Sequence, residues 1–180
     1  MPCCIISAGM KVELDLCELL NKLFPSGNMH VIYEKEISTK SIIVSPRPVW
    51  KCLTCEFYGK RPSCPPHAPH WKEAKDWVRS YKKAMLIKFE VDMKNFDNEK
   101  RDVLLYLLRR ERELFSEYPY VFALFPGACN LCDECEFEKS ESCPLRDKVR
   151  PSIDAVGIEI TSITEINYDE NVLYGLIFLD

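Results

Sequence analysis

Two groups of cysteines in this 180-residue chain have spacings that suit metal ligation. The later group reads Cys129-x2-Cys132-x2-Cys135-x7-Cys143-Pro144. Two successive two-residue spacings let three thiolates surround one face of a cubic iron–sulfur cluster, so that each thiolate reaches a different iron. Bacterial ferredoxins hold a four-iron cluster with the run C-x2-C-x2-C-x3-C-P. The spacing therefore predicts a [4Fe-4S] cluster at these four cysteines, with a last spacer of seven residues instead of three.

Zinc and inert burial are the two alternatives for this second group. Structural zinc sites typically present two separated C-x2-C pairs, whereas here three cysteines share one continuous run. A free cysteine can also pack as a small apolar residue. However, Asp133, Glu134 and Glu136 lie within the run or beside it, so we expect no core around it. Both considerations favour the cluster.

The earlier group reads Cys52-x2-Cys55-x8-Cys64-Pro65-Pro66 and leaves two interpretations open. With His67 as fourth ligand, it is a closed Cys3His zinc site. With three thiolates alone, it holds a second iron–sulfur cluster whose last iron is open or is completed from elsewhere in the chain. The residues considered for that completion are Cys3, Cys4, Cys17 and Cys143, and His70 is a further histidine near the group.

Composition limits the classes of partner and compartment. A formal net charge of −4 and a pI near 5.5 disfavour nucleic-acid binding. The N-terminus shows no basic leader, and the apolar run 172–179 is too short to span a bilayer. We therefore expect a cytoplasmic protein without a membrane partner, in which clustered thiols bind metal more often than they form disulfides.

The elements that must position these cysteines follow from hydrophobic periodicity and from turn residues. Expected helices cover about 10–24, 69–81, 97–117 with Asp97 as N-cap, and 151–156 closed by Gly157. Expected strands cover 31–33, 41–44, 84–91, 120–125, 158–163 and 172–179. This order predicts an α/β or α+β fold, with one domain over residues 1–180, a mixed sheet with flanking helices, and both cysteine groups on loops.

Three segments resemble a prokaryotic family of predicted metal-binding proteins. They are residues 51–66, residues 125–135 and residues 150–159, and the match spans about 52–180. The resemblance implies metal ligation by Cys52, Cys55, Cys64, Cys129, Cys132, Cys135 and Cys143, and it implies no particular reaction. Arg150, in the third segment, is either a solvated charge before a helix or a cation beside an anionic cluster.

Three functions are compatible with these residues. The first is an electron-transfer protein or redox accessory, whose partner is another redox protein. The second is an enzyme in which a three-cysteine cluster leaves one iron open to a small-molecule substrate. The third is a zinc-stabilised structural or interaction protein. No Gly-rich phosphate loop or Ser-His-Asp arrangement is evident, so the sequence favours electron transfer and leaves enzyme activity undecided.

Overall fold

A four-stranded sheet organises residues 30–180, the part of the chain that the computed structural model describes. The strands are β1 (His30–Ser38), β2 (Lys83–Glu90), β3 (Phe122–Leu124) and β4 (Val172–Leu179), in the spatial order β1-β2-β4-β3. The α-helices are α2 (Pro46–Cys52), α3 (Trp71–Ser80), α4 (Phe96–Leu114) and α5 (Glu136–Ser140). Three 3-10 turns are η1 (Thr39–Ser41), η2 (Met93–Asn95) and η3 (Ile160–Ser162).

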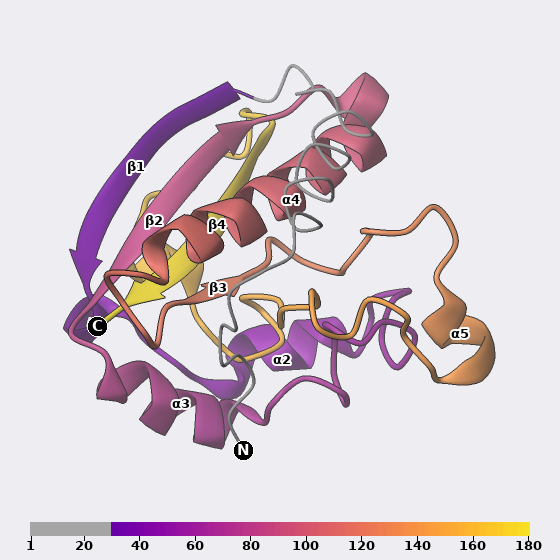
Figure 1. The fold of residues 1–180 in the computed structure, drawn as a ribbon, viewed down its shortest axis with the longest axis horizontal. Coiled ribbons are helices and arrows are strands. Elements are labelled where there is room, and N and C mark those ends of the chain that lie inside the picture. Colours follow the sequence, from indigo (N-terminus) through magenta and orange to yellow (C-terminus); the bar gives the residue numbers. More distant parts are fainter. Residues whose placement is uncertain (1–29) are drawn as a thin grey trace, which may run out of the picture.

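The central strands β2 and β4 are largely buried because a helix covers each face of the sheet, whereas the edge strand β1 is more exposed. In β2, Leu86 contributes to one apolar cluster and its neighbour Ile87 contributes to the other, as strand alternation requires. Helix α3 packs on the first face through Val78, and α4 packs on the second face through Leu104. Figure 1 shows α4 lying across the sheet, with the loops that carry α2 and α5 beyond its lower edge.

The expected α+β class is confirmed. Strand β4 has the bounds expected from sequence, and all three strand pairs are antiparallel. Within residues 30–180, parallel pairing is confined to an isolated bridge between Phe125 and Ser152. The sheet itself is therefore antiparallel and not mixed as expected, and the bridge joins the residue after β3 to the segment after the second cysteine group.

Several short elements differ from the sequence expectation. Segments 41–44 and 158–163 do not form sheet strands; they meet at one isolated bridge, Val44 to Ile158. Segment 151–156 forms turns, and the N-cap of α4 is Asn95 rather than Asp97, which lies in the first turn. These stretches have β-branched or cap-like residues, but their backbone bonds go to loops instead of to a neighbouring strand.

Helix α2 was not predicted, because its prolines read as loop punctuation. Pro46 and Pro48 occupy the first turn, where a missing N–H has no intrahelical partner to lose. Ser45 caps the helix by accepting a hydrogen bond from the Arg47 N–H at 3.1 Å. The first cysteine of the first group consequently lies at the end of a helix rather than in a loop.

The expected helix at 10–24 lies outside the described residues. Within residues 30–180, no helix has both the length and the apolar character that a bilayer crossing needs.

Gly157 provides a test of this packing, because its φ of +79° favours glycine and its surroundings leave no room for a Cβ. A Cβ there would lie 2.5 Å from the Ser45 carbonyl oxygen and 2.8 Å from Trp71 Cβ. We expect Gly157→Ala to lose about 1–2 kcal/mol of unfolding free energy from the positive φ and about 1–3 kcal/mol more from overlap. Urea denaturation measures the loss.

Gly59→Ala is the matched control, since Gly59 has φ +73° and nothing within 4 Å of the Cβ position. Gly59→Ala should lose only the unfolding free energy that a non-glycine residue at positive φ costs. Equal losses for the two variants would contradict the close approach of residue 157 to α2.

Candidate metal centre

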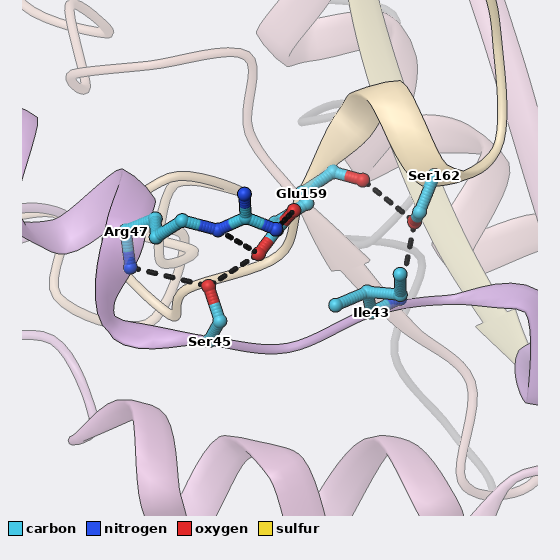
Figure 2. Close-up of polar contacts among 5 residues, drawn as sticks. All are labelled: Ile43, Ser45, Arg47, Glu159 and Ser162. Carbon is cyan, nitrogen blue, oxygen red and sulfur yellow. Dashed lines mark hydrogen bonds and ion pairs between the residues drawn. The ribbon is translucent and has the colours of Figure 1, made fainter.

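The first cysteine group starts at the end of α2, and the start of that helix is fastened to the segment after Gly157. Glu159 accepts hydrogen bonds from Ser45 Oγ and from the Arg47 guanidinium, the latter with Nε at 2.9 Å from the carboxylate (Figure 2). Ser162 Oγ accepts from the Ile43 N–H at 3.0 Å and donates to the Glu159 carbonyl at 2.7 Å (Figure 2). These contacts fix the axis of α2, and therefore the place of Cys52.

The loop from Cys52 to Cys64 is held by its own backbone. The Cys55 N–H donates to the Cys52 carbonyl at 3.0 Å, and the Gly59 N–H donates to the Pro65 carbonyl at 2.9 Å. Cys55 is exposed, Cys52 is half-buried and Cys64 is buried. The group thus spans the boundary between solvent and interior.

Both histidines considered for this group use one ring nitrogen in a contact with a backbone group. His67 Nε2 lies 3.2 Å from the Gly59 carbonyl oxygen, to which it can only donate, and the ring packs edge-on against Phe137. His70 caps α3, with Nδ1 accepting from the Lys72 N–H at 3.2 Å. These contacts give both rings structural partners.

The second cysteine group follows β3 and is attached to the N-terminal half of α4. Arg101 Nε donates to the Asn130 carbonyl at 3.1 Å, and its guanidinium pairs with Asp133 at 2.7 Å. Asn130 Nδ2 donates to the Asp97 carbonyl at 2.8 Å. One helix therefore determines the course of the loop between Cys129 and Cys135.

The second group is not wholly outside the core, and the expectation that no core surrounds it is wrong for its first member. Cys129 is buried and belongs to the same apolar cluster as Phe125 and the α4 side chains. Cys132, Cys135 and Cys143 are half-buried. The charged residues between the cysteines face outward, while Cys129 continues the inward face of the strand that precedes it.

The two groups are neighbours in space, although the sequence separates them. Ser63 is fully buried, and its Oγ accepts a hydrogen bond from the Cys129 N–H at 2.7 Å. Its carbonyl accepts from the Ser152 N–H at 3.0 Å. Outside this contact, Arg61 pairs with Glu138 of α5 at 3.1 Å. The loop of the first group consequently packs directly on the loop of the second.

Burial and mutual repulsion disfavour free thiolates in both groups. Burial, together with negative charge on Cys143, Cys132 and Cys135, raises the pKa of Cys129 to about 11. A backbone hydrogen bond from Leu131 lowers that pKa by a smaller amount. Burial likewise raises the pKa of Cys132. In both residues burial is the largest cause of the raised pKa.

The first group behaves in the same way. Burial, then negative charge on Asp154, Cys64 and Cys55, raises the pKa of Cys52 to about 11. Burial also raises the pKa of Cys64, which Lys100 and Arg61 oppose. Without a cation to replace the protons, these side chains are neutral at physiological pH.

All seven cysteines of residues 30–180 are free thiols. In that part of the chain, no three His, Cys, Asp or Glu side chains converge closely enough to hold a metal ion as they stand. The donor set is nevertheless of the kind that iron–sulfur clusters and zinc take. Ligation would require the thiol-bearing loops to close, and such coupling of metal binding to local folding is usual for thiolate sites.

Arg150 has a structural partner that neither interpretation of the sequence named. Its guanidinium makes a bidentate ion pair with Glu111 of α4, with Nη2 at 2.5 Å, and stacks 5.1 Å from the centre of the Phe122 ring. Glu111 also accepts from the Ala123 N–H of β3 at 2.6 Å. Arg150 therefore fixes the chain after the second group to the sheet.

The sequence pattern did not indicate the roles of Ser63 and Arg101. Each is one polar residue in a loop or helix, and its role depends on a partner far along the chain. A small pocket elsewhere, lined by Ile42, Ile43, Val44, Lys75, Val78 and Arg79, contains none of the cysteines.

The comparisons agree with a metal-binding role. The chain belongs to the family described as predicted metal-binding protein (DUF2284), whose model matches residues 35–173. The matched range includes both cysteine groups and the segment that anchors α2. No curated protein and no solved structure matches the chain.

Ser63→Ala tests the junction between the two groups. The change leaves the buried Cys129 N–H without an acceptor, which should lower the unfolding free energy by about 1–3 kcal/mol. Ser80→Ala is the control, because Ser80 Oγ bonds the Trp77 carbonyl at an exposed position. Denaturant unfolding of both variants measures the difference. Similar losses of unfolding free energy would show that the Ser63 hydrogen bond stabilises the fold no more than an exposed one does.

Thiol modification tests the burial pattern. In metal-free protein near neutral pH, we expect iodoacetamide to label the exposed Cys55 first and the buried Cys64 and Cys129 last, because access and thiolate fraction both limit the reaction. Peptide mass spectrometry over time gives the order. Early labelling of Cys129 would contradict its place in the core.

Proposed function

We propose that this protein binds a [4Fe-4S] cluster through Cys129, Cys132, Cys135 and Cys143, and acts in electron transfer or as a redox accessory. A second metal centre, either a cluster or zinc, would use Cys52, Cys55 and Cys64. Such a cluster accepts and releases single electrons when bound. The chain itself supplies the thiolates, excludes water from one side of each group and neutralises part of the negative charge.

The observation that carries the proposal is the set of four free thiols on one short stretch of chain, with Cys129 buried and Cys132, Cys135 and Cys143 half-buried. The spacer between Cys135 and Cys143 is folded: helix α5 occupies most of it, and Glu141, in the left-handed conformation, ends that helix. The long last spacer is therefore a compact helical turn between two half-buried thiols. The spacing of the triplet, which is unusual for zinc, favours iron and sulfide over a single tetrahedral ion.

Burial on one side supports the redox function further. Cys129 lies in the core and Cys135 begins an exposed helix, so a centre at this group would lie at the surface of the domain. A centre in that position can exchange electrons with a docked redox protein. Polypeptide hydrogen bonds to the sulfurs, such as that from Leu131, and local charge tune the reduction potential.

An open-site enzyme remains the second candidate, and one observation favours it. In residues 30–180, His70 Nδ1 accepts from the Lys72 N–H and is therefore not available as a fourth ligand of the first group, and His67, which donates from Nε2 to the Gly59 carbonyl, has only Nδ1 left for ligation. A three-thiolate centre leaves a coordination position for a small substrate. Cys52, Cys55 and Cys64 are the residues that would hold it.

The test is a metal and acid-labile sulfide analysis of anaerobically prepared protein, with single substitutions. Iron and sulfide in equal amounts, four of each per cluster, are expected in the wild type. Cys132→Ser should remove the second-group cluster with its visible absorption and lower the melting temperature, because ligation stabilises the loop. Cys64→Ser should remove only metal of the first group.

Ser140→Ala is the control in the same segment, since Ser140 is exposed and its Oγ donates to the Glu136 carbonyl of its own helix. It should retain all iron and sulfide. Zinc without sulfide in the anaerobic wild type would end the redox proposal. Full iron content in a folded Cys132→Ser protein would exclude Cys132 as a ligand.

A further inference from the structure

Residues 61–67 of the first-group loop form two successive turns on either side of Cys64, and we call them the bridging turns. The Cys64 N–H donates to the Arg61 carbonyl at 3.1 Å, and the His67 N–H donates to the Cys64 carbonyl at 2.9 Å. Main-chain hydrogen bonds therefore link the position of Cys64 to the positions of Arg61 and His67. Between them, Ser63 makes the contact with the second group described above.

The bridging turns also contact α5, the helix that fills most of the spacer between the third and fourth cysteines of the second group. Arg61 Nε lies 3.1 Å from a carboxylate oxygen of Glu138. The His67 ring packs edge-on against Phe137, with 4.7 Å between the ring centres. Two adjacent residues of α5 thus pack on the same short stretch of the first-group loop.

Helix α5 needs such support, because it has five residues and none of them is buried. A helix of that length is not stable by itself in water. Among the side-chain ion pairs and hydrogen bonds of residues 30–180, those of α5 otherwise stay within its own segment: Lys139 pairs with Glu134, and Ser140 donates to the Glu136 carbonyl. The polar contact that ties α5 to a distant segment is the one with Arg61.

The Arg61 side chain is well placed to act on α5. It is 17% exposed and stacks 5.2 Å from the centre of the Phe57 ring, so solvent screens its charge less than that of a surface arginine. Its contact with Glu138 lacks hydrogen-bond geometry, which leaves Arg61 Nε a buried donor without a hydrogen bond within residues 30–180. A shift of α5 that aligns this pair would therefore gain a buried hydrogen bond.

Each cysteine group must close before it can hold a metal, since no three ligands converge within the described residues. Closure of the first group would fix Cys64 and, through the main-chain hydrogen bonds, the bridging turns that support α5. Closure of the second group would fix α5 between Cys135 and Cys143, and so the surface on which the bridging turns pack. Each binding event would perform part of the ordering that the other requires, which is a source of positive cooperativity.

We propose that the two cysteine groups bind metal cooperatively, and that Arg61 and His67 are positioning residues that transmit the coupling through α5. This inference rests on the proposed ligation by the cysteines. Coupling is reciprocal, so metal at either group raises the affinity of the other by the same factor, typically about 5–150-fold.

Zn²⁺ titration of reduced, metal-free protein against a competing chelator tests the proposal. Cys52→Ser/Cys55→Ser removes the first centre without changing the bridging turns, and Cys132→Ser/Cys143→Ser removes the second without changing α5. Each double variant should bind one Zn²⁺ and give a single-site constant. The overall constant of the wild type for two Zn²⁺ should exceed the product of these constants by about 5–150-fold. Equality of the two values would overturn the proposal.

Arg61→Met tests the route of the coupling, because methionine keeps an unbranched apolar stem and removes the charge. In the Arg61→Met background, the overall constant should fall to the product of the single-site constants measured in that background. Glu138→Gln, at a more exposed position, should act in the same way if Arg61→Met folds poorly. Lys60→Met removes an exposed neighbouring charge and should leave the coupling as in the wild type. Full coupling in both Arg61→Met and Glu138→Gln would contradict the role of this contact.

The cysteine variants separate this inference from the function beneath it. If each double variant loses one Zn²⁺ and the remaining site binds as tightly as in the wild type, the cysteines are ligands and the cooperativity is wrong. If both double variants bind two Zn²⁺ as the wild type does, the ligand assignment itself fails.

Discussion

The hydrogen bond between the Cys129 N–H and Ser63 Oγ is the contact on which the cysteine region depends. It joins the loop that follows α2 to the loop that follows β3, and it does so at Ser63 and Cys129, which are both buried. The surrounding contacts, from Arg61 to Glu138 and from Ser152 to the Ser63 carbonyl, keep the loops in that arrangement. The cysteines are free thiols, so no bond between sulfur atoms joins the two loops. Before metal binds, this polar junction must therefore hold the loops together.

Charge balance is the second constraint, and it connects the fold to the proposed chemistry. The thiols of Cys52 and Cys129 resist ionisation because each is buried and lies near other cysteines of its own group, and a metal cation reverses that preference. Basic residues from two segments neutralise carboxylates beside the groups: Arg61, in the loop of the first group, pairs with Glu138, and Arg101 of α4 pairs with Asp133.

The sequence predicted the elements whose periodicity is long and regular, and missed contacts between distant segments. Strand β4 and helix α4 were recognisable from apolar alternation and from an apolar stripe. Helix α2 was hidden by Pro46 and Pro48, which a first helical turn accepts. The cysteine spacing indicated metal ligands, but not that Cys129 enters the core or that Ser63, 66 residues away, bonds its backbone. No local pattern encodes such pairing.

X-ray absorption at the metal edge of the anaerobic protein tests the central claim most directly, because it reports the atoms bound to the metal. Ligation by the two cysteine groups predicts a first shell of sulfur, at about 2.3 Å, and for a cluster an additional iron–iron shell. A first shell composed mainly of nitrogen or oxygen would contradict the account, because the metal would then be held by other residues.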